Sequence, residues 1–95
     1  PKEVEQVIDE LDQVAESAVI GLPHPDFGEG VTAVVVRQQG AELEEAKVIK
    51  HLDGRLAKYK QPKRVFFVDE LPRNTMGKVQ KNELRKRFND TYRAS

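Results

Sequence analysis

The residues best suited to chemistry lie in one short stretch, between Leu71 and Lys81. Pro72 fixes its own φ angle and disfavours helix at the residue before it. Gly77 can adopt backbone conformations closed to other residues, so the side chain after it can be sharply aimed. That side chain is Lys78, a long cation with three hydrogen-bond donors. The spacing predicts a stiff loop that presents Lys78 to an anionic group, with an ordinary solvated turn as the alternative.

Other catalytic and metal-binding patterns are missing from the sequence. A phosphate-binding P-loop needs G-x-x-x-x-G-K-[ST], but Pro72 replaces the first glycine and Val79 replaces the final hydroxyl residue. We find no Ser-His-Asp set, carboxylate pair or cluster of metal ligands. The chain has no cysteine, and its two histidines, His24 and His51, are far apart, so neither a disulfide nor a zinc site is expected. Because His24 lies between two prolines, it is expected to be a surface loop residue.

A second candidate site surrounds Tyr59. Five cations lie close to it in the sequence, namely Arg55, Lys58, Lys60, Lys63 and Arg64. A tyrosine among cations suits a nucleotide-containing ligand, through ring stacking and phosphate contacts, whereas the alternative is a solvated helix end. The alternation of basic and apolar residues over 60–67 also suggests RNA binding. However, residues 63–68 lack the glycine and aromatic positions of the RNP1 motif, so a nucleic-acid-binding module is the weaker alternative.

Size and charge place these candidates on a single small domain. Ninety-five residues form one core, with little room for a deep, self-contained active site. The net charge is zero, yet residues 1–48 carry three Lys/Arg and eleven Asp/Glu (−8), while residues 49–95 carry thirteen and five (+8). The basic half can form a face that meets phosphates, or simply a solvated surface. No apolar run approaches the roughly 18 residues of a membrane span, and the first residues do not resemble a signal peptide.

Hydrophobic spacing predicts the elements in the first half of the chain. A helix is predicted over 1–12 by one apolar stripe, formed by Val4, Val7, Ile8 and Leu11. A strand is expected over 15–22 and a second over 31–37, which is apolar on both faces as in a covered central strand. Residues 21–30 are rich in glycine and proline and predict a loop, and residues 38–40 predict a turn. Because the chain starts directly at a helix, we interpret it as a piece of a longer protein.

The second half predicts a helix, a strand and a final helix. The helix over 44–58 ends at a break over 59–62, and its inward side chains are Val48, Ile49, Leu52 and Leu56. A strand follows over 63–68, and a last helix over 81–92 has one apolar side, formed by Leu84, Phe88 and Tyr92. The order α-β-β-α-β-α predicts an α+β domain, with two or three helices flanking a small three-stranded sheet and a lysine-bearing loop or hairpin before the last helix.

Four stretches in register, spread across the full length of the chain, resemble one family. They are residues 1–5, 17–29, 56–63 and 72–78, the last with the pattern P-x-x-x-x-G-K, and Leu84-Arg85 follow as in many members. On these motifs the chain resembles the small C-terminal domain of the adenylate-forming enzymes, which include acyl-CoA synthetases, nonribosomal peptide adenylation domains and luciferases. Within that family, its sequence is most similar to malonyl-CoA synthetases.

The resemblance implies that residues 1–95 are the mobile lid of an ATP-dependent acid–CoA ligase, which converts a carboxylate, ATP and CoA into acyl-CoA, AMP and pyrophosphate. The hinge and a large N-terminal domain would lie upstream. The large domain would hold ATP, Mg²⁺ and the acyl pocket, so the lid alone is expected to be inactive. Lys78 would stabilise charge during adenylation, with Pro72 and Gly77 shaping the loop that carries it.

The resemblance also implies a coenzyme A site, because family members use the region matching Tyr59 and Gln61 to contact that ligand. Gln61 stands where some relatives place an arginine. We therefore expect Lys58, Lys60 or Lys63 to supply the phosphate contact.

Regulation and location are implied in the same way. Some bacterial relatives are switched off when the signature lysine is acetylated, so Lys78 is a candidate target of a lysine acetyltransferase. We expect a cytoplasmic protein with no membrane span and no nucleic-acid partner. The alternatives are another short- or medium-chain acyl-CoA ligase, or a non-enzymatic module of the same fold that binds RNA or protein.

Overall fold

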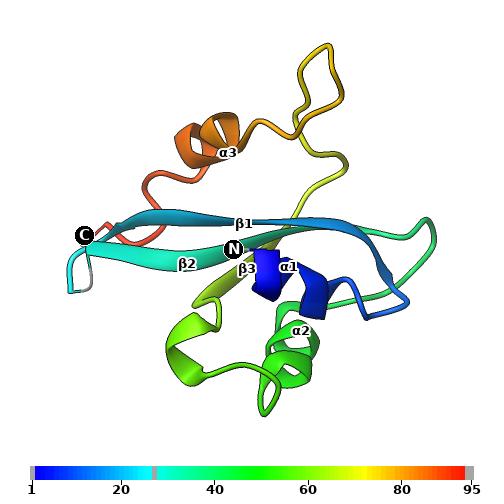
Figure 1. Cartoon of the computed structure of the whole chain (residues 1–95), viewed down its shortest axis with the longest axis horizontal. Coiled ribbons are helices and arrows are strands. Elements are labelled where there is room, and N and C mark those ends of the chain that lie inside the picture. Colours follow the sequence, from blue (N-terminus) through cyan, green and yellow to red (C-terminus); the bar gives the residue numbers. More distant parts are fainter. Residues whose placement is uncertain (1, 27, 94–95) are drawn as a thin grey trace.

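The computed structural model describes residues 2–26 and 28–93, which form one three-stranded sheet with helices on both faces (Figure 1). The order along the chain is α1 (Lys2–Ile8), β1 (Val14–His24), β2 (Gly28–Arg37), α2 (Glu45–Leu52), a 3₁₀ turn η1 (Lys58–Lys60), β3 (Arg64–Phe67) and α3 (Lys81–Arg87). This confirms the predicted α+β class and the order α-β-β-α-β-α.

The sheet has the strand order β1-β2-β3, with β2 in the centre. β1 and β2 pair antiparallel as a long hairpin, from His24 opposite Gly28 to Val14 opposite Arg37. β3 lies parallel to β2, with Val65 opposite Ala33. A parallel pair needs a crossover connection, and the segment carrying α2 and η1 supplies it.

The hairpin is longer than the sequence predicted, and the loop expected over 21–30 is wrong for most of its length. β1 continues through Leu22, which is fully buried, and through Pro23. A proline is tolerated there because β1 is an edge strand. β2 already begins at Gly28, and a Cβ on Gly30 would lie 2.7 Å from Cε2 of Tyr92. Gly30 therefore makes room for an aromatic ring, and it marks close packing rather than a turn.

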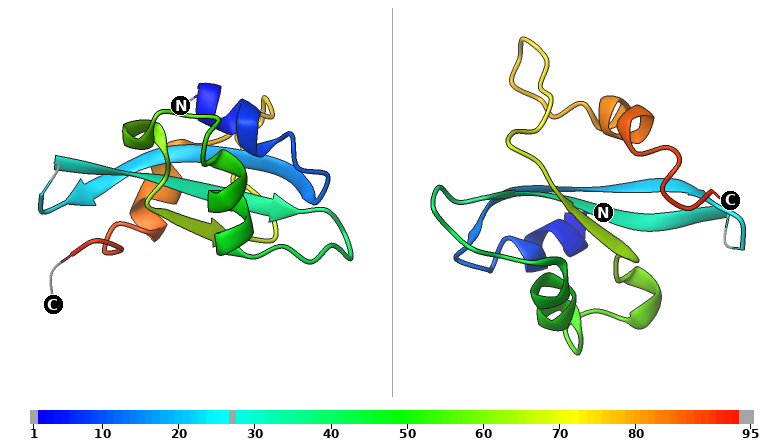
Figure 2. Two further views of the ribbon diagram at one scale, coloured as in Figure 1. Left: turned by 90° about the horizontal axis from the view of Figure 1, so that it is seen from below. Right: turned by 180° about the vertical axis from the view of Figure 1, so that it is seen from behind.

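The expectation of a single core is wrong, because the sheet is covered on both faces and the buried residues form two clusters. The first core lies between the sheet and the α1–α2 layer. α1 contributes Val4 and Ile8, and α2 contributes Val48 and Leu52, all of them buried. Alternate residues of the strands complete this core, with Val14, Val19, Ala33, Val35 and Val65. α1 and α2 are seen on the same side of the sheet in Figure 1 and in the right-hand view of Figure 2.

The second core lies on the opposite face, which α3 covers (Figure 1). Leu84 of α3 is fully buried against β-strand residues that include Ile20 and Val34. Leu71, just after β3, belongs to the same core, and Phe88 and Tyr92 pack against its margin. The ring of Phe88 stacks on Phe66 with centroids 4.6 Å apart.

The helices are shorter than predicted. α1 ends at Ile8 rather than residue 12, and Pro1 lies outside the described residues. α2 ends at Leu52 rather than Lys58, because the chain turns at Gly54, whose φ is +85°, and Leu56 is buried from outside the helix. α3 ends at Arg87, so Tyr92 lies beyond the helix. It packs against the second core from a turn, although it was predicted to lie on the apolar side of a helix over 81–92.

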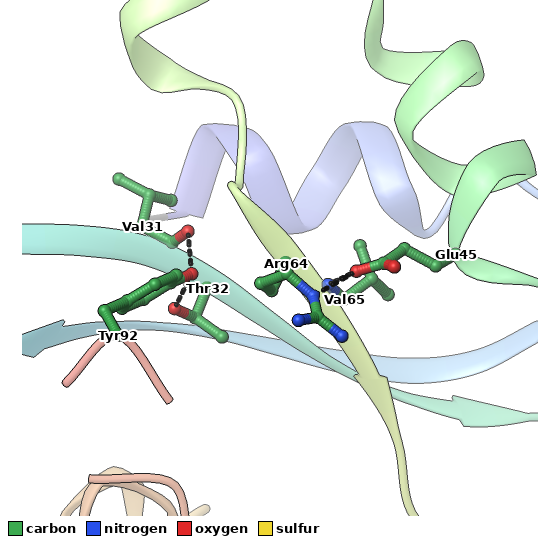
Figure 3. A network of polar contacts seen from close by, with 6 residues as sticks. All are labelled: Val31, Thr32, Glu45, Arg64, Val65 and Tyr92. Atoms are coloured by element: carbon green, nitrogen blue, oxygen red, sulfur yellow. Dashed lines mark hydrogen bonds and ion pairs between the residues drawn. The ribbon is translucent and has the colours of Figure 1, made fainter. Parts of the chain in front are cut away.

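Two groups of polar contacts join other segments to the sheet (Figure 3). One involves Tyr92 of the C-terminal turn, and the other involves Glu45 of α2. The hydroxyl of Tyr92 lies 2.8 Å from Oγ1 of Thr32, which is fully buried and donates to the carbonyl of Gly30. Burial raises the pKa of Tyr92, so the phenol stays protonated at neutral pH. On the other side, Glu45 accepts hydrogen bonds from the backbone N–H of Val65 at 2.8 Å and from Nε of Arg64 at 2.9 Å.

The Glu45 contacts predict a pH-dependent contribution to stability. The backbone hydrogen bond from Val65, together with Arg64, lowers the pKa of Glu45 below its ordinary value of 4.5. The stabilisation is therefore fully present above that value and is lost as the pH falls through the lowered pKa. We expect Glu45→Gln to lower the free energy of unfolding by about 1 kcal/mol at pH 7, and by less below pH 4, when measured by urea unfolding.

Glu44→Gln is the matched control, because Glu44 is exposed and its side chain makes no capping hydrogen bond. It should change stability little at either pH. A Glu45→Gln effect of equal size at pH 7 and pH 3 would contradict an electrostatic origin.

Candidate functional site

The loop that carries Lys78 is a miniature hairpin that projects from the sheet on the same side as α3 (Figure 1). Arg73 and Val79 form an antiparallel bridge at its base. The N–H of Gln80 donates to the carbonyl of Pro72 at 2.8 Å, and the N–H of Asn74 donates to the carbonyl of Lys78 at 3.0 Å. The stiff, lysine-bearing loop or hairpin expected before the last helix is thus present.

Asn74 organises the tip of this loop. Its side-chain Oδ1 accepts hydrogen bonds from the N–H of Met76 at 2.9 Å and of Lys78 at 3.0 Å. Its backbone carbonyl also accepts from the N–H of Gly77 at 3.0 Å. Asn74 was not among the predicted site residues, although an asparagine at the start of a tight turn commonly accepts a hydrogen bond from the backbone two residues on.

Gly77 adopts the conformation expected of it. Its φ is +83°, a region that other residues rarely occupy, and no atom lies within 4 Å of where a Cβ would be. The requirement for glycine here is therefore conformational and not a matter of space. The carbonyl of Gly77 accepts a hydrogen bond from Nη1 of Arg73 at 2.6 Å, which closes the loop from its N-terminal side.

Lys78 is exposed at this tip. Its ammonium group makes no hydrogen bond or ion pair with any of residues 2–26 or 28–93. The neighbouring Met76 is 87% exposed, which is unusual for a large apolar side chain. The loop therefore presents a cation and an apolar side chain together, both available to a surface outside this domain.

The second candidate region, around Tyr59, lies on the other face of the sheet. Tyr59 is 80% exposed on η1. The ammonium of Lys60 lies 5.8 Å from the centroid of its ring and 3.0 Å from Oε2 of Glu3. The hydrogen bond from Lys60 to Glu3 raises the pKa of that ammonium. A cavity of about 340 Å³ adjoins this pair and is lined by Lys2, Glu3, Val4, Val31, Tyr59 and Lys60.

The other residues predicted for this region lie close by but differ in their surroundings. Lys58 and Lys63 are exposed, and the backbone N–H of Lys63 donates to the carbonyl of Val31 at 2.8 Å. Gln61 is half-buried, and its amide donates to the carbonyl of Leu56 at 3.4 Å. Arg55 instead pairs with Glu10 at 2.6 Å, as Arg64 pairs with Glu45. Both arginines of the predicted cluster are thus held in ion pairs with other elements.

The two candidate regions are separated by the sheet. η1 lies on the α1–α2 side, whereas the loop of residues 72–80 lies on the α3 side (Figures 1 and 2). The structure thus brings Lys58, Tyr59 and Lys60 together and keeps Lys78 apart from them.

The described residues contain no group of three or more His, Cys, Asp or Glu side chains that could hold a metal ion. In the same described ranges, no helix is long and apolar enough to cross a bilayer. His24, expected on the surface, is half-buried, with its ring 5.1 Å from that of Tyr92.

Comparison with known proteins gives a consistent result. Residues 3–78 match the family described as the AMP-binding enzyme C-terminal domain. Indoleacetate–CoA ligase from Aromatoleum aromaticum is 46% identical over 85 residues, which are 90% of this chain and 17% of that protein. Long-chain-fatty-acid–CoA ligase FadD13 from Mycobacterium tuberculosis is 43% identical over 91 residues, which are 96% of this chain and 18% of that protein.

Solved structures of related proteins resemble this chain in fold as well as in sequence. The apo crystal structure of MatB from Rhodopseudomonas palustris superposes with a TM-score of 0.96 at 66% identity, and it covers 98% of this chain and 19% of that one. The ATP-bound structure of MatB gives a TM-score of 0.95 at 64% identity, with 98% and 18% covered. The chain thus spans less than a fifth of these relatives. By sequence and by fold, the chain belongs to the family of AMP-binding enzyme C-terminal domains, whose homologues here are acyl-CoA ligases.

Proposed function

We propose that this domain is the mobile lid of an AMP-forming acid–CoA ligase and that Lys78 is its catalytic residue in adenylation. The observation that carries the proposal is an exposed ammonium group without a partner in the described ranges, at the tip of a hydrogen-bonded hairpin. A lysine with no use inside its own domain is suited to a pocket formed by another part of the polypeptide. The large N-terminal domain would form that pocket and would also hold ATP and Mg²⁺.

The chemistry follows from the charge that develops during acyl-adenylate formation. A carboxylate oxygen attacks the α-phosphorus of ATP, and pyrophosphate leaves with the electron pair of the bond that breaks. An ammonium group placed between the carboxylate and the phosphoryl oxygens brings two anions together and stabilises the developing charge. In this role Lys78 is an electrostatic clamp and not a base.

The separation of the two candidate regions supports a second step on the other face. After adenylation the lid would rotate and present the η1 face, where Tyr59 can stack against CoA and Lys58, Lys60 or Lys63 can contact its phosphates. Gln61 would offer an amide in place of a charge. The CoA thiolate would then attack the acyl carbon, so that the C–S bond forms as AMP leaves.

The proposed acid is malonate, from the sequence resemblance to malonyl-CoA synthetases. The curated relatives carry the names of other acids, which makes a different short- or medium-chain acid the first alternative. The acyl pocket would lie in the large domain, so this chain offers no residue that selects the acid. The proposed location is the cytoplasm. A non-enzymatic interaction module is the remaining alternative, and an encoding frame without an upstream domain would favour it.

Lys78→Ala in the full-length enzyme should slow adenylation by roughly a hundredfold to a thousandfold, because one charge-stabilising donor is lost. Thioester formation from supplied acyl-adenylate and CoA should stay close to the wild-type rate. Lys86→Ala is the matched control, since Lys86 is an exposed lysine of α3 whose ammonium lies 3.8 Å from Glu83. Equal loss of both half-reactions in the Lys78 variant would refute the assigned role.

ATP–pyrophosphate exchange by the full-length enzyme should identify the acid. Across a panel of small carboxylic acids, malonate should support the fastest exchange, with monocarboxylates such as acetate and butyrate well below it. If a monocarboxylate supported the fastest exchange, that acid would become the proposed substrate instead of malonate, and the assignment as a ligase would stand. Exchange with no acid in a broad panel would instead favour the non-enzymatic alternative.

Acetylation of Lys78 should abolish adenylation, because it removes the charge that the reaction needs. We expect a protein lysine acetyltransferase to add one acetyl group to the folded enzyme, seen by intact mass and located by peptide mapping. A lysine deacetylase should then restore activity. Modification confined to other lysines would contradict Lys78 as the regulatory site.

A further inference from the structure

We propose that Glu5 and Glu16 are positioning residues for Lys78, which they serve through two ion pairs that fix the two ends of its loop to the sheet. The inference rests on the proposed function of Lys78. Neither carboxylate lies in the loop itself. Glu5 belongs to α1 and Glu16 to β1, more than fifty residues before Lys78 in the sequence.

The first anchor holds the N-terminal end of the loop. Arg73 forms an ion pair through Nη2 with Oε1 of Glu16, while its other terminal nitrogen, Nη1, donates to the carbonyl of Gly77 at 2.6 Å. One guanidinium therefore joins β1 to the residue that precedes Lys78. The planar fork of arginine suits such a double contact, which a lysine would not reproduce.

The second anchor holds the C-terminal end. The ammonium of Lys81, the first residue of α3, lies 2.8 Å from Oε2 of Glu5. The same carboxylate oxygen accepts the backbone N–H of Val19 at 2.7 Å. The Glu5 side chain is 20% exposed and that of Lys81 is 34% exposed, so this pair is less screened by solvent than a fully exposed one.

The second anchor uses the open edge of the sheet. β1 pairs with β2 on one side only, and the N–H of Val19 donates to Glu5 rather than to a neighbouring strand. Glu5 thereby connects α1 on one face with the start of α3 on the other, around the edge of β1. It also satisfies a backbone donor that an edge strand would otherwise leave open.

The two anchors, together with the burial of Leu71 and the packing of Val79 against the second core, hold the loop that carries Lys78 in place relative to the domain. The hydrogen bonds of Asn74 and the bridge between Arg73 and Val79 fix the shape of the loop. They do not fix its direction, because they are all internal to it. The ion pairs at Arg73 and Lys81 connect this preformed hairpin to the sheet on either side of Lys78. A displacement of about 1 Å at a reacting group can cost on the order of a hundredfold in rate, so the anchors bear directly on adenylation.

Three isosteric substitutions in the full-length enzyme test this inference, namely Glu5→Gln, Glu16→Gln and Glu83→Gln. Each removes one charge from an ion pair, and Gln at position 5 keeps an oxygen that can accept the N–H of Val19. Glu83 is the control, because its pair with Lys86 lies on the exposed side of α3. We expect the first two to slow adenylation about tenfold and the third to leave it unchanged. Thioester formation from supplied acyl-adenylate should be unaffected in all three.

A second background separates positioning from general damage. In an enzyme that already carries Lys78→Ala, Glu5→Gln and Glu16→Gln should slow adenylation no further, because their effect acts through the missing ammonium. Equal slowing in both backgrounds, or equal slowing by Glu83→Gln, would overturn the inference. The inference would also fail if Glu5→Gln and Glu16→Gln both left adenylation at the wild-type rate while Lys78→Ala slowed it strongly. If Lys78→Ala itself left adenylation intact, the proposed function would fail as well.

Discussion

Burial of β2 on both faces is the constraint on which the rest of the structure depends. Ala33, Val34 and Val35 are fully buried in succession, so neighbouring side chains belong to different cores. Each face then needs its own cover. α1 and α2 supply one, and α3 with the residues after β3 supplies the other. The two candidate regions inherit this division, since η1 follows α2 on one face and the lysine hairpin precedes α3 on the other. The placement of the two candidate regions on different faces is thus a consequence of one doubly covered strand.

The class, the order of elements and most core residues could be predicted from hydrophobic spacing, because helices and strands differ in period. Element ends were harder to predict, since they depend on tertiary contacts. Gly30 resembles a turn residue in the sequence, yet it lies in β2 and its small size admits the Tyr92 ring. Leu56 fits the periodicity of α2, yet it reaches the core after the chain has turned at Gly54. In both cases the spacing of apolar residues predicted which side chains reach the core, but it did not predict the path of the backbone between them.

The shape of the lysine hairpin could be predicted because its determinants are local. Pro72 and Gly77 indicated it through φ restriction and a positive φ. The hydrogen bonds to the Asn74 side chain are equally local, but they were not predicted. Its attachment could not be predicted, because Glu5 and Glu16 are distant in sequence and resemble ordinary surface carboxylates. The cluster around Tyr59 shows the opposite case. Adjacent cations in the sequence suggested one basic site, whereas Arg55 and Arg64 are taken up by carboxylates from other elements.

The packing of Leu84, Phe88 and Tyr92 bears on where the folding unit ends. The family match stops at residue 78, and the P-x-x-x-x-G-K pattern ends there too. The second core extends beyond residue 78, because Leu84 is fully buried and the Tyr92 hydroxyl lies 2.8 Å from that of the buried Thr32. A domain boundary placed at residue 78 would remove α3 and the turn after it, and would expose Ile20, Leu22 and Val34 on that face of the sheet. The family match thus ends before the packed structure does, and the turn that carries Tyr92 is part of the scaffold.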